Sequence, residues 1–237
     1  MPNPYFSFKQ FTVFQDRCAM KVGIDGVLLG AWAPVENTNH ILDIGTGTGL
    51  IALMLAQRSS SLIDAIDIDS SAVAQAAGNI KLSPWATRIN VQEMSLQDFA
   101  ATTTQRYDLI VSNPPYFVNS LKAPSIHRTI ARHTDSLTHE ELIVNALHLL
   151  KPTGRICLIL PVNEALDCEK FALNNGLFCT SEVKVIPKPN ADVKRMLLEF
   201  SLQSYQKEIS ELVIESNERH RYSEEFSLLA KEFYLKL

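Results

Sequence analysis

The chain of 237 residues is long enough for one large α/β domain with a full core, and its 46% apolar and 20% charged residues are typical of globular proteins. The net charge of −4 argues against broad, nonspecific binding of nucleic acid but leaves room for a local basic face. Because the chain shows no membrane-length apolar run, no secretory signal and no Cys-x-x-Cys pair among its four cysteines, we expect a cytoplasmic protein without structural zinc or a disulfide framework.

Residues 1–39 are predicted to form an N-terminal cover over a sheet. Loose alternation of apolar and polar side chains over residues 5–13 indicates a short strand or hairpin. Asp25 then fits the N-cap position of an apolar helix that carries Trp32, and Pro34 ends that helix.

A glycine-rich turn follows the first buried strand. The strand, residues 41–44, runs into Gly45-Thr46-Gly47-Thr48-Gly49 and then into an apolar helix, which is the order of a nucleotide-binding βα unit. The spacing lacks the last glycine of a dinucleotide site and the Gly-Lys-Ser/Thr ending of a phosphate loop. Asp43 would be poorly placed beside a pyrophosphate but suits a cationic amine. The motif therefore predicts S-adenosylmethionine, which carries that amine and no phosphate, although a glycine-rich turn without function remains the alternative.

Two polar residues that follow the next strands are candidates for the rest of this ligand. Asp67 comes at the end of the strand over residues 62–69, where an acidic group can accept both hydroxyls of a ribose. Asp69 or Ser70 is the better N-cap for the helix that follows. Ser95 lies in the turn after the third strand, about residues 89–92, and is expected to flank the adenine of the cofactor.

The fourth strand, residues 107–111, leads into Ser112-Asn113-Pro114-Pro115-Tyr116. The two prolines stop the strand and stiffen the turn, because neither has an N–H for a sheet ladder. The Asn113 amide oxygen and the Pro114 carbonyl can accept the two hydrogens of a planar NH2 group, which favours a more pyramidal nitrogen with a freer lone pair. Tyr116 offers a face on which a base can stack. The turn predicts methylation of an amino group, and a proline-rich turn with a packed tyrosine is the structural alternative.

Basic side chains follow this turn. Residues 117–134 contain no acidic residue, and a second basic group lies in the hairpin predicted over residues 178–186 and 194–202. Either group could contact phosphates or simply form a solvated face. The candidates for RNA contact are Lys122, Arg128, Arg132, His133, Lys188 and Arg195.

The remaining segments complete one predicted domain without internal repeats or linkers. Ser136 or Thr138 caps a helix through residue 150, a strand covers residues 155–160, and a helix covers 163–175. The tail, residues 209–237, ends in an apolar-periodic helix. We expect a monomer with a single domain, residues 1–237, divided into the cover (1–39), a cofactor-binding and catalytic core (40–203) and a C-terminal extension (204–237).

Together, Asp43 to Gly49, Asp67 and Asn113 to Tyr116 resemble a class I S-adenosylmethionine-dependent methyltransferase that acts on amino groups. Further segments resemble the bacterial tRNA1(Val) (adenine(37)-N6)-methyltransferase family; they are Phe11-Thr12-Val13, Met20-Lys21-Val22, Leu28-Leu29-Gly30-Ala31-Trp32, Ala131-Arg132-His133 and Phe233-Tyr234-Leu235-Lys236-Leu237. The resemblance spans nearly the whole chain. It implies methylation of the exocyclic amine of adenine 37 in the anticodon loop.

The resemblance also implies a fold and roles for residues. The fold is a Rossmann-like α/β domain with a mostly parallel seven-stranded sheet, a terminal antiparallel hairpin and helices on both faces. The methionine part of the cofactor would lie at Asp43, Gly45, Gly47 and Gly49, the ribose at Asp67, the target amine at Asn113 and Pro114, and the base on Tyr116. Ser95 departs from the pattern, since many relatives have an aspartate there for the cofactor's N6 amine, and a hydroxyl is a weaker acceptor.

Three other functions use a similar turn or fold. A glutamine-amide protein methyltransferase usually has a helical domain before the glycine loop, and only about forty residues precede Asp43. A DNA adenine methyltransferase would need room for a target-recognition domain. A non-catalytic RNA-binding module would not require the Asn113 to Tyr116 turn.

Overall fold

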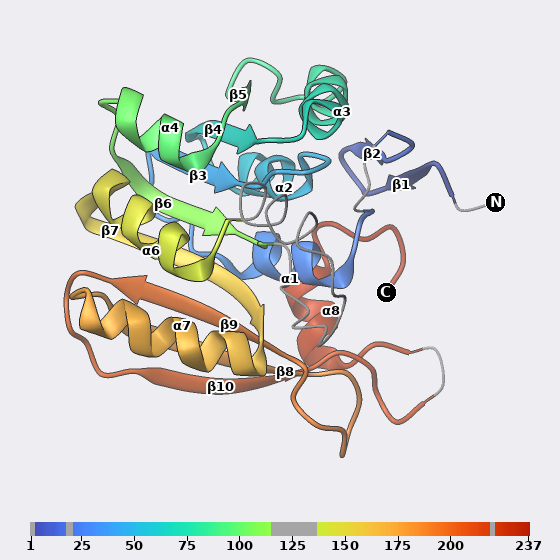
Figure 1. The fold of residues 1–237 in the computed structure, drawn as a ribbon. Helices are drawn as coiled ribbons and strands as arrows, with labels where there is room; N and C mark the ends of the chain where they lie inside the picture. The colour runs from blue at the N-terminus through green and yellow to red at the C-terminus, as the bar shows by residue number, and fades with distance from the viewer. Residues whose placement is uncertain (1–2, 18–20, 115–136, 219–220) are drawn as a thin grey trace, which may run out of the picture.

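The computed structural model describes residues 3–17, 21–114, 137–218 and 221–237, and it shows a central sheet between two layers of helices (Figure 1). The strands are β1 (Tyr5–Ser7), β2 (Thr12–Phe14), β3 (His40–Ile44), β4 (Leu62–Asp67), β5 (Ile89–Glu93), β6 (Tyr107–Ser112), β7 (Leu150–Pro161), β8 (Phe178–Ile186), β9 (Arg195–Ser201) and β10 (Glu208–Val213). The helices are α1 (Ile24–Trp32), α2 (Leu50–Arg58), α3 (Ser70–Lys81), α4 (Leu96–Thr102), α6 (His139–Leu149), α7 (Val162–Asn174) and α8 (Glu224–Ala230). None of the helices in the described part of the chain is long and apolar enough to span a bilayer.

The alternation of side chains along each strand divides the core into two halves. In β3, Ile41 packs on the side of the sheet covered by α1, α2, α3 and α8, whereas Leu42 and Ile44 pack on the side covered by α4, α6 and α7. Both faces of the central strands are therefore buried. This burial explains why these strands are nearly continuous apolar runs in the sequence.

The sheet order is β10-β8-β9-β7-β6-β3-β4-β5. From β3 the chain moves outward through β4 and β5, then returns to place β6 on the other side of β3, with parallel pairing throughout. The two halves of the sheet therefore diverge between β3 and β6. In open α/β sheets, ligands bind outside the carboxyl ends of strands at such a switch point.

The mostly parallel sheet with an antiparallel β8–β9 hairpin confirms the predicted fold class, but the described residues form a sheet of eight strands instead of seven. The additional strand, β10, pairs in parallel with β8 at the sheet edge. Leu212 is its one buried residue, and residues 208–211 are exposed. An edge strand with so few buried side chains has a weak apolar pattern, and its position depends on main-chain pairing with a distant segment.

Two of the predicted helix starts are confirmed and one is wrong. Thr138 and Glu141 form a capping box at the start of α6, and the Asp69 side chain accepts a hydrogen bond from Ser71 N at the start of α3. Asp25, in contrast, is not the N-cap of α1. Gly23 occupies that position, and Asp25 lies in the first turn of the helix.

The two ends of the chain pack together. Phe8 forms an antiparallel bridge with Tyr234, and Lys9 N donates to Phe233 O at 2.8 Å. The rings of Phe6, Phe8 and Phe226 contact the ring of Tyr234 with centroids 5.8 to 6.0 Å apart. The N-terminal hairpin of β1 and β2 and the C-terminal segment around α8 thus lie side by side (Figure 1).

This contact predicts a stability effect at Phe233, which is only 2% exposed. We expect Phe233→Ala to lower the free energy of unfolding by about 3–5 kcal/mol, because it leaves a cavity in the buried cluster to which Phe8 and Phe226 also belong. Leu235→Ala is the matched control, since Leu235 is 61% exposed, and it should change the same quantity by less than about 0.5 kcal/mol. Urea unfolding of the two variants measures the difference, and equal losses would contradict the packing described here.

Candidate active site

The glycine turn and the Asn113 turn lie side by side although they are about 70 residues apart in the sequence. Ser112, the last residue of β6, pairs with Ile44, the last residue of β3. The Ser112 hydroxyl also donates to the Ile44 carbonyl oxygen at 2.8 Å. Asn113 and Gly45, the residues that follow, therefore leave neighbouring strands at the same level of the sheet.

The glycine turn has the backbone conformation that its sequence predicts. Gly45, Gly47 and Gly49 have φ values of 70°, 57° and 81°, in the left-handed region that L side chains rarely adopt. A Cβ atom at Gly49 would lie 3.3 Å from the Ala76 side chain, so this glycine allows α2 and α3 to approach. A Cβ at Gly45 or Gly47 would meet no atom within 4 Å. The backbone at these two positions therefore borders open space, as a closely approaching ligand requires.

Asp43 lies beneath this turn and is fully buried. Its Oδ2 atom accepts hydrogen bonds from Thr46 Oγ1 at 2.7 Å and from Ala52 N at 3.2 Å. Its Oδ1 atom is buried and receives no hydrogen bond from any residue that the structure describes. Burial raises the pKa of the Asp43 carboxyl to about 7, the hydrogen bonds from Thr46 and Ala52 act in the opposite direction, and the Asp67 charge adds to the increase. An oxygen without a donor is suited to a ligand that brings one, such as an amine.

Asp67 lies at the carboxyl end of β4, on the other side of the glycine turn from Asn113. The side chain is half-buried, and its Oδ2 atom accepts a hydrogen bond from Gly47 N at 2.8 Å. Its Oδ1 atom accepts one from Asp69 N at 3.0 Å. A carboxylate has about four acceptor positions, and donors from the described part of the chain occupy two of them, so the carboxylate can also accept hydroxyl groups. Asp67, the glycine turn and Asn113 thus follow one another along the carboxyl ends of β4, β3 and β6, and their roles toward a ligand stay predictions.

Ser95 is the N-cap of α4. Its hydroxyl oxygen accepts a hydrogen bond from Asp98 N at 3.0 Å, and the hydroxyl donates to Asp98 Oδ2 at 2.7 Å. These bonds use the hydroxyl proton within the helix cap. Ser95 follows β5, as the sequence predicts, whereas its position beside the cofactor and its contact with an adenine stay predictions.

The structure describes only part of the predicted catalytic turn and of the RNA-binding group. Asn113 is half-buried and Pro114 is buried at the end of β6. The other residues of these two groups lie outside the described residues; they are Pro115, Tyr116, Lys122, Arg128, Arg132 and His133.

Of the two basic residues in the β8–β9 hairpin, one is exposed and one is held by an acidic side chain. Lys188 is exposed in the turn. Arg195, at the start of β9, donates from Nε to Asp25 Oδ2 at 2.9 Å and so connects β9 to the first turn of α1. The side chains of this pair are 29% and 17% exposed. Arg195 thus has a structural partner that the sequence did not indicate, and a contact with RNA would have to be made by the paired guanidinium.

Asn79 is a further polar residue at this site that the sequence analysis missed. It is buried on α3, accepts a hydrogen bond from Phe14 N and donates to the carbonyl oxygens of Phe14 and Thr48, each at 2.9 Å. The side chain therefore joins the N-terminal hairpin to the glycine turn. An asparagine in the middle of an amphipathic helix is a weak signal, because its buried position depends on a strand 65 residues away.

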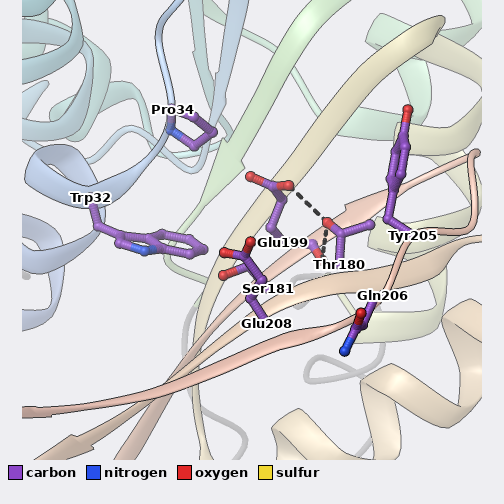
Figure 2. Close-up of a pocket in the computed structure, with 8 residues that line it drawn as sticks. All are labelled: Trp32, Pro34, Thr180, Ser181, Glu199, Tyr205, Gln206 and Glu208. Atoms are coloured by element: carbon purple, nitrogen blue, oxygen red, sulfur yellow. Dashed lines mark hydrogen bonds between the residues drawn. The ribbon is translucent and has the colours of Figure 1, made fainter.

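A separate pocket lies at the end of the sheet opposite to the glycine turn, and Figure 2 shows the residues that line it. Its volume is about 380 Å³, and Trp32, Glu199 and Tyr205 are among its lining residues. Thr180 Oγ1 donates to Glu199 Oε1 there at 2.7 Å. These residues lie near the start of β8 and the end of β9, whereas the carboxyl end of β7 pairs with the start of β9. The pocket is therefore remote from the glycine turn and from Asn113.

The described residues contain no group of three or more His, Cys, Asp or Glu side chains arranged to hold a metal ion.

Known proteins share both the sequence and the fold. The methyltransferase small domain model matches residues 26–185. A tRNA1(Val) (adenine(37)-N6)-methyltransferase from Parabacteroides distasonis is 53% identical, with 100% of both chains covered. One of the same name from Trichodesmium erythraeum is 49% identical, with 98% of both chains covered. The chain belongs to the tRNA1(Val) (adenine(37)-N6)-methyltransferase family.

Solved structures agree with the family at the level of the fold. A protein from Agrobacterium tumefaciens described as a predicted O-methyltransferase superposes with a TM-score of 0.67 at 18% identity, covering 88% of this chain and 96% of that one. A ribosomal protein L11 methylase from Lactobacillus delbrueckii gives a TM-score of 0.57 at 18% identity, covering 80% and 83%. Both solved structures have the same class I methyltransferase fold as this protein.

Because the backbone at Gly47 borders open space, a side chain there should affect ligand binding in addition to stability, whereas a side chain at Gly176 should affect stability alone. Gly47→Ala and Gly176→Ala both place a side chain at a positive φ with no atom within 4 Å, so each should cost about 1–2 kcal/mol of unfolding free energy. Only Gly47→Ala should weaken binding of S-adenosylmethionine, by at least about tenfold, because its methyl group fills the space beside the turn. Calorimetric titration of the two variants measures this, and equal affinities would remove Gly47 from the ligand site.

Proposed function

We propose that this protein transfers a methyl group from S-adenosylmethionine to the N6 amine of adenine 37 in the anticodon loop of tRNA1(Val). The observation that carries the proposal is the pairing of Ser112 with Ile44, which places the Asn113 turn beside the glycine turn. Membership in the family, with relatives matched over the full chain, supports the substrate. A tRNA substrate would place the reaction in the cytoplasm.

The residues around the glycine turn fit the cofactor. Asp67 would accept the ribose hydroxyls, Gly45 and Gly47 would allow close approach of the backbone, and the buried Oδ1 atom of Asp43 would face the amine. Ser95 follows the strand beside Asp67 and would flank the adenine. When bound, the cofactor supplies a methyl group that is already activated by a positive sulfur. The chain therefore needs neither a covalent nucleophile nor a metal for this transfer.

The Asn113 turn would hold the acceptor. The Asn113 side-chain oxygen and the Pro114 carbonyl oxygen would each accept one hydrogen of the adenine amine, and Pro115 would keep the turn stiff. Bases in single-stranded loops can be turned out of the base stack. The adenine would leave the stack of the anticodon loop in this way and would then stack on Tyr116. Positioning and electrostatics would provide most of the rate, since the proton of the amine can leave after methyl transfer.

Basic side chains would contact the RNA backbone around this acceptor. Lys122, Arg128, Arg132 and His133 directly follow the Asn113 turn in the sequence, and Lys188 is exposed in the β8–β9 turn. Such contacts would orient the loop without reading its sequence. Selection of the tRNA would then depend on whether the loop can present its base to the Asn113 turn.

Two substitutions separate the proposed roles. Asn113→Ala should lower kcat by about 10²–10³-fold and change cofactor affinity by less than about twofold, because it removes a contact to the acceptor amine. Asp67→Ala should weaken cofactor binding instead. Asn174→Ala, at the exposed end of α7, is the control and should change neither quantity. Single-turnover kinetics and calorimetry measure the two effects, and an equal loss of turnover and affinity in Asn113→Ala would refute its assigned role.

The substrate is tested with transcripts. We expect tRNA1(Val) with adenine at position 37 to accept labelled methyl groups, and the same transcript with guanine at that position to accept none, because it lacks the exocyclic N6 amine. Mapping of the modified nucleoside should identify N6-methyladenosine. Cofactor binding without methylation of any tRNA, together with methylation of a protein glutamine, would favour the amide methyltransferase, and RNA binding without turnover would favour a binding module.

A further inference from the structure

The glycine turn is held by two different elements, one at each of its ends. At its start, Gly45 N and Thr46 N donate to the Ile66 carbonyl oxygen of β4, at 2.9 and 3.0 Å. At its other end, the Thr48 carbonyl oxygen accepts a hydrogen bond at 2.9 Å from Nδ2 of Asn79, which lies on α3. The shape of the turn therefore depends on a side chain that follows it by 31 residues in the sequence.

The helix after the turn does not supply a donor for the Thr48 carbonyl oxygen. In a helix that began earlier, Ala52 N would donate to this oxygen, but it donates to Asp43 Oδ2 instead, at 3.2 Å. Thr48 is only 5% exposed, so its main chain has little access to water. Asn79 thus provides the one donor that the described residues offer to a buried main-chain acceptor.

The Asn79 side chain also holds the N-terminal hairpin. Its Oδ1 atom accepts a hydrogen bond from Phe14 N, and its Nδ2 atom donates to the Phe14 carbonyl oxygen, each at 2.9 Å. One turn earlier on α3, Gln75 Oε1 accepts a hydrogen bond from Arg17 N at 2.9 Å and so holds the same segment. Both amides are buried, but in the described part of the chain only that of Asn79 also bonds to the glycine turn.

The bond to Thr48 acts on a stretch of chain with unusual conformational freedom. Gly47 and Gly49, on either side of Thr48, have positive φ values, and glycine populates positive and negative φ about equally. Without a donor on the Thr48 carbonyl oxygen, the peptide between Thr48 and Gly49 can adopt other orientations in the unliganded protein. A ligand that binds one orientation then loses affinity in proportion to the fraction of molecules that hold it.

We propose that Asn79 is a positioning residue for the cofactor: it holds the Thr48 carbonyl group and so keeps the glycine turn in its binding form before S-adenosylmethionine arrives. Asn79 acts on the ligand through the main chain of the turn. The inference rests on the proposed function only in that S-adenosylmethionine is the ligand of this turn. It extends that function to a residue of α3, outside the turn and the strand ends.

Asn79→Ala and Gln75→Ala separate this role from the docking of the hairpin. Each variant removes a buried amide that bonds to residues 14–17, so both should lower the urea midpoint of unfolding. Only Asn79→Ala should raise the Kd for S-adenosylmethionine, by about tenfold if the turn holds its binding form in about a tenth of the molecules. Gln75→Ala should change this Kd by less than about twofold, because the turn keeps its donor. Calorimetric titration below the unfolding transition measures both values.

Steady-state kinetics provide a second readout that a purely structural role would not change. For Asn79→Ala, we expect the KM for S-adenosylmethionine to rise about tenfold, whereas kcat and the KM for tRNA1(Val) stay within about twofold of the wild type. The reason is that saturating cofactor restores the binding form of the turn. A loss of folded protein would instead lower kcat at every cofactor concentration and leave the KM unchanged.

The outcomes are distinguishable. Wild-type cofactor affinity in Asn79→Ala would overturn the inference and leave the proposed function intact. Equal losses of affinity in Asn79→Ala and Gln75→Ala would also overturn it, since docking of the hairpin would then set the affinity. Absence of cofactor binding by the wild type would contradict the proposed function itself. If Asn79→Ala does not fold, Asn79→Asp decides, because it keeps the shape and an acceptor for Phe14 N but has no N–H for Thr48, and it should show the same loss of affinity.

Discussion

The parallel pairing of β3 with β6 is the interaction on which the candidate site depends. It aligns Ile44 with Ser112, and the hydrogen bond from the Ser112 hydroxyl to the Ile44 carbonyl oxygen holds the two strand ends at the same level. A shift of one residue would exchange the faces of every side chain in the strand and would bury the wrong set. The apolar core on both faces therefore also fixes the position of Asn113 relative to the glycine turn.

The glycine turn is shaped chiefly by main-chain bonds. Gly45 N and Thr46 N both donate to the Ile66 carbonyl oxygen, at 2.9 and 3.0 Å, and Gly49 N donates to the Thr46 carbonyl oxygen. The turn is thus tied to β4, and Asp67 at the end of that strand is placed beside Gly47. Within this turn, the buried Oδ1 atom of Asp43 has no hydrogen-bond donor among the described residues, which lowers the stability of the folded state. Such a loss of stability is expected at a ligand site where a cationic ligand would supply the donor.

The two ends of the chain support the site from outside. The N-terminal hairpin is joined to α3 and to the glycine turn by Asn79, and it also packs against the C-terminal segment through Tyr234. Asp25 of α1 pairs with Arg195 of β9 near the carboxyl end of β7. The N-terminal hairpin, α1 and the C-terminal segment therefore support the elements that carry the predicted ligand residues. This role agrees with a family resemblance that extends to both ends of the chain.

The sequence by itself determined the features that depend on neighbouring residues. The strand, glycine turn and helix around Gly45 to Gly49, the caps at Asp69 and Thr138, and the break after Asn113 all follow from local conformational preferences and hydrogen bonds within a few residues. Only the tertiary structure decided which distant segments meet: the pairing of β10 with β8, the Asp25–Arg195 ion pair, and the hydrogen bonds of Asn79 with Phe14 and Thr48. These contacts are selected by packing and main-chain pairing over the whole fold, so a single local pattern does not encode them.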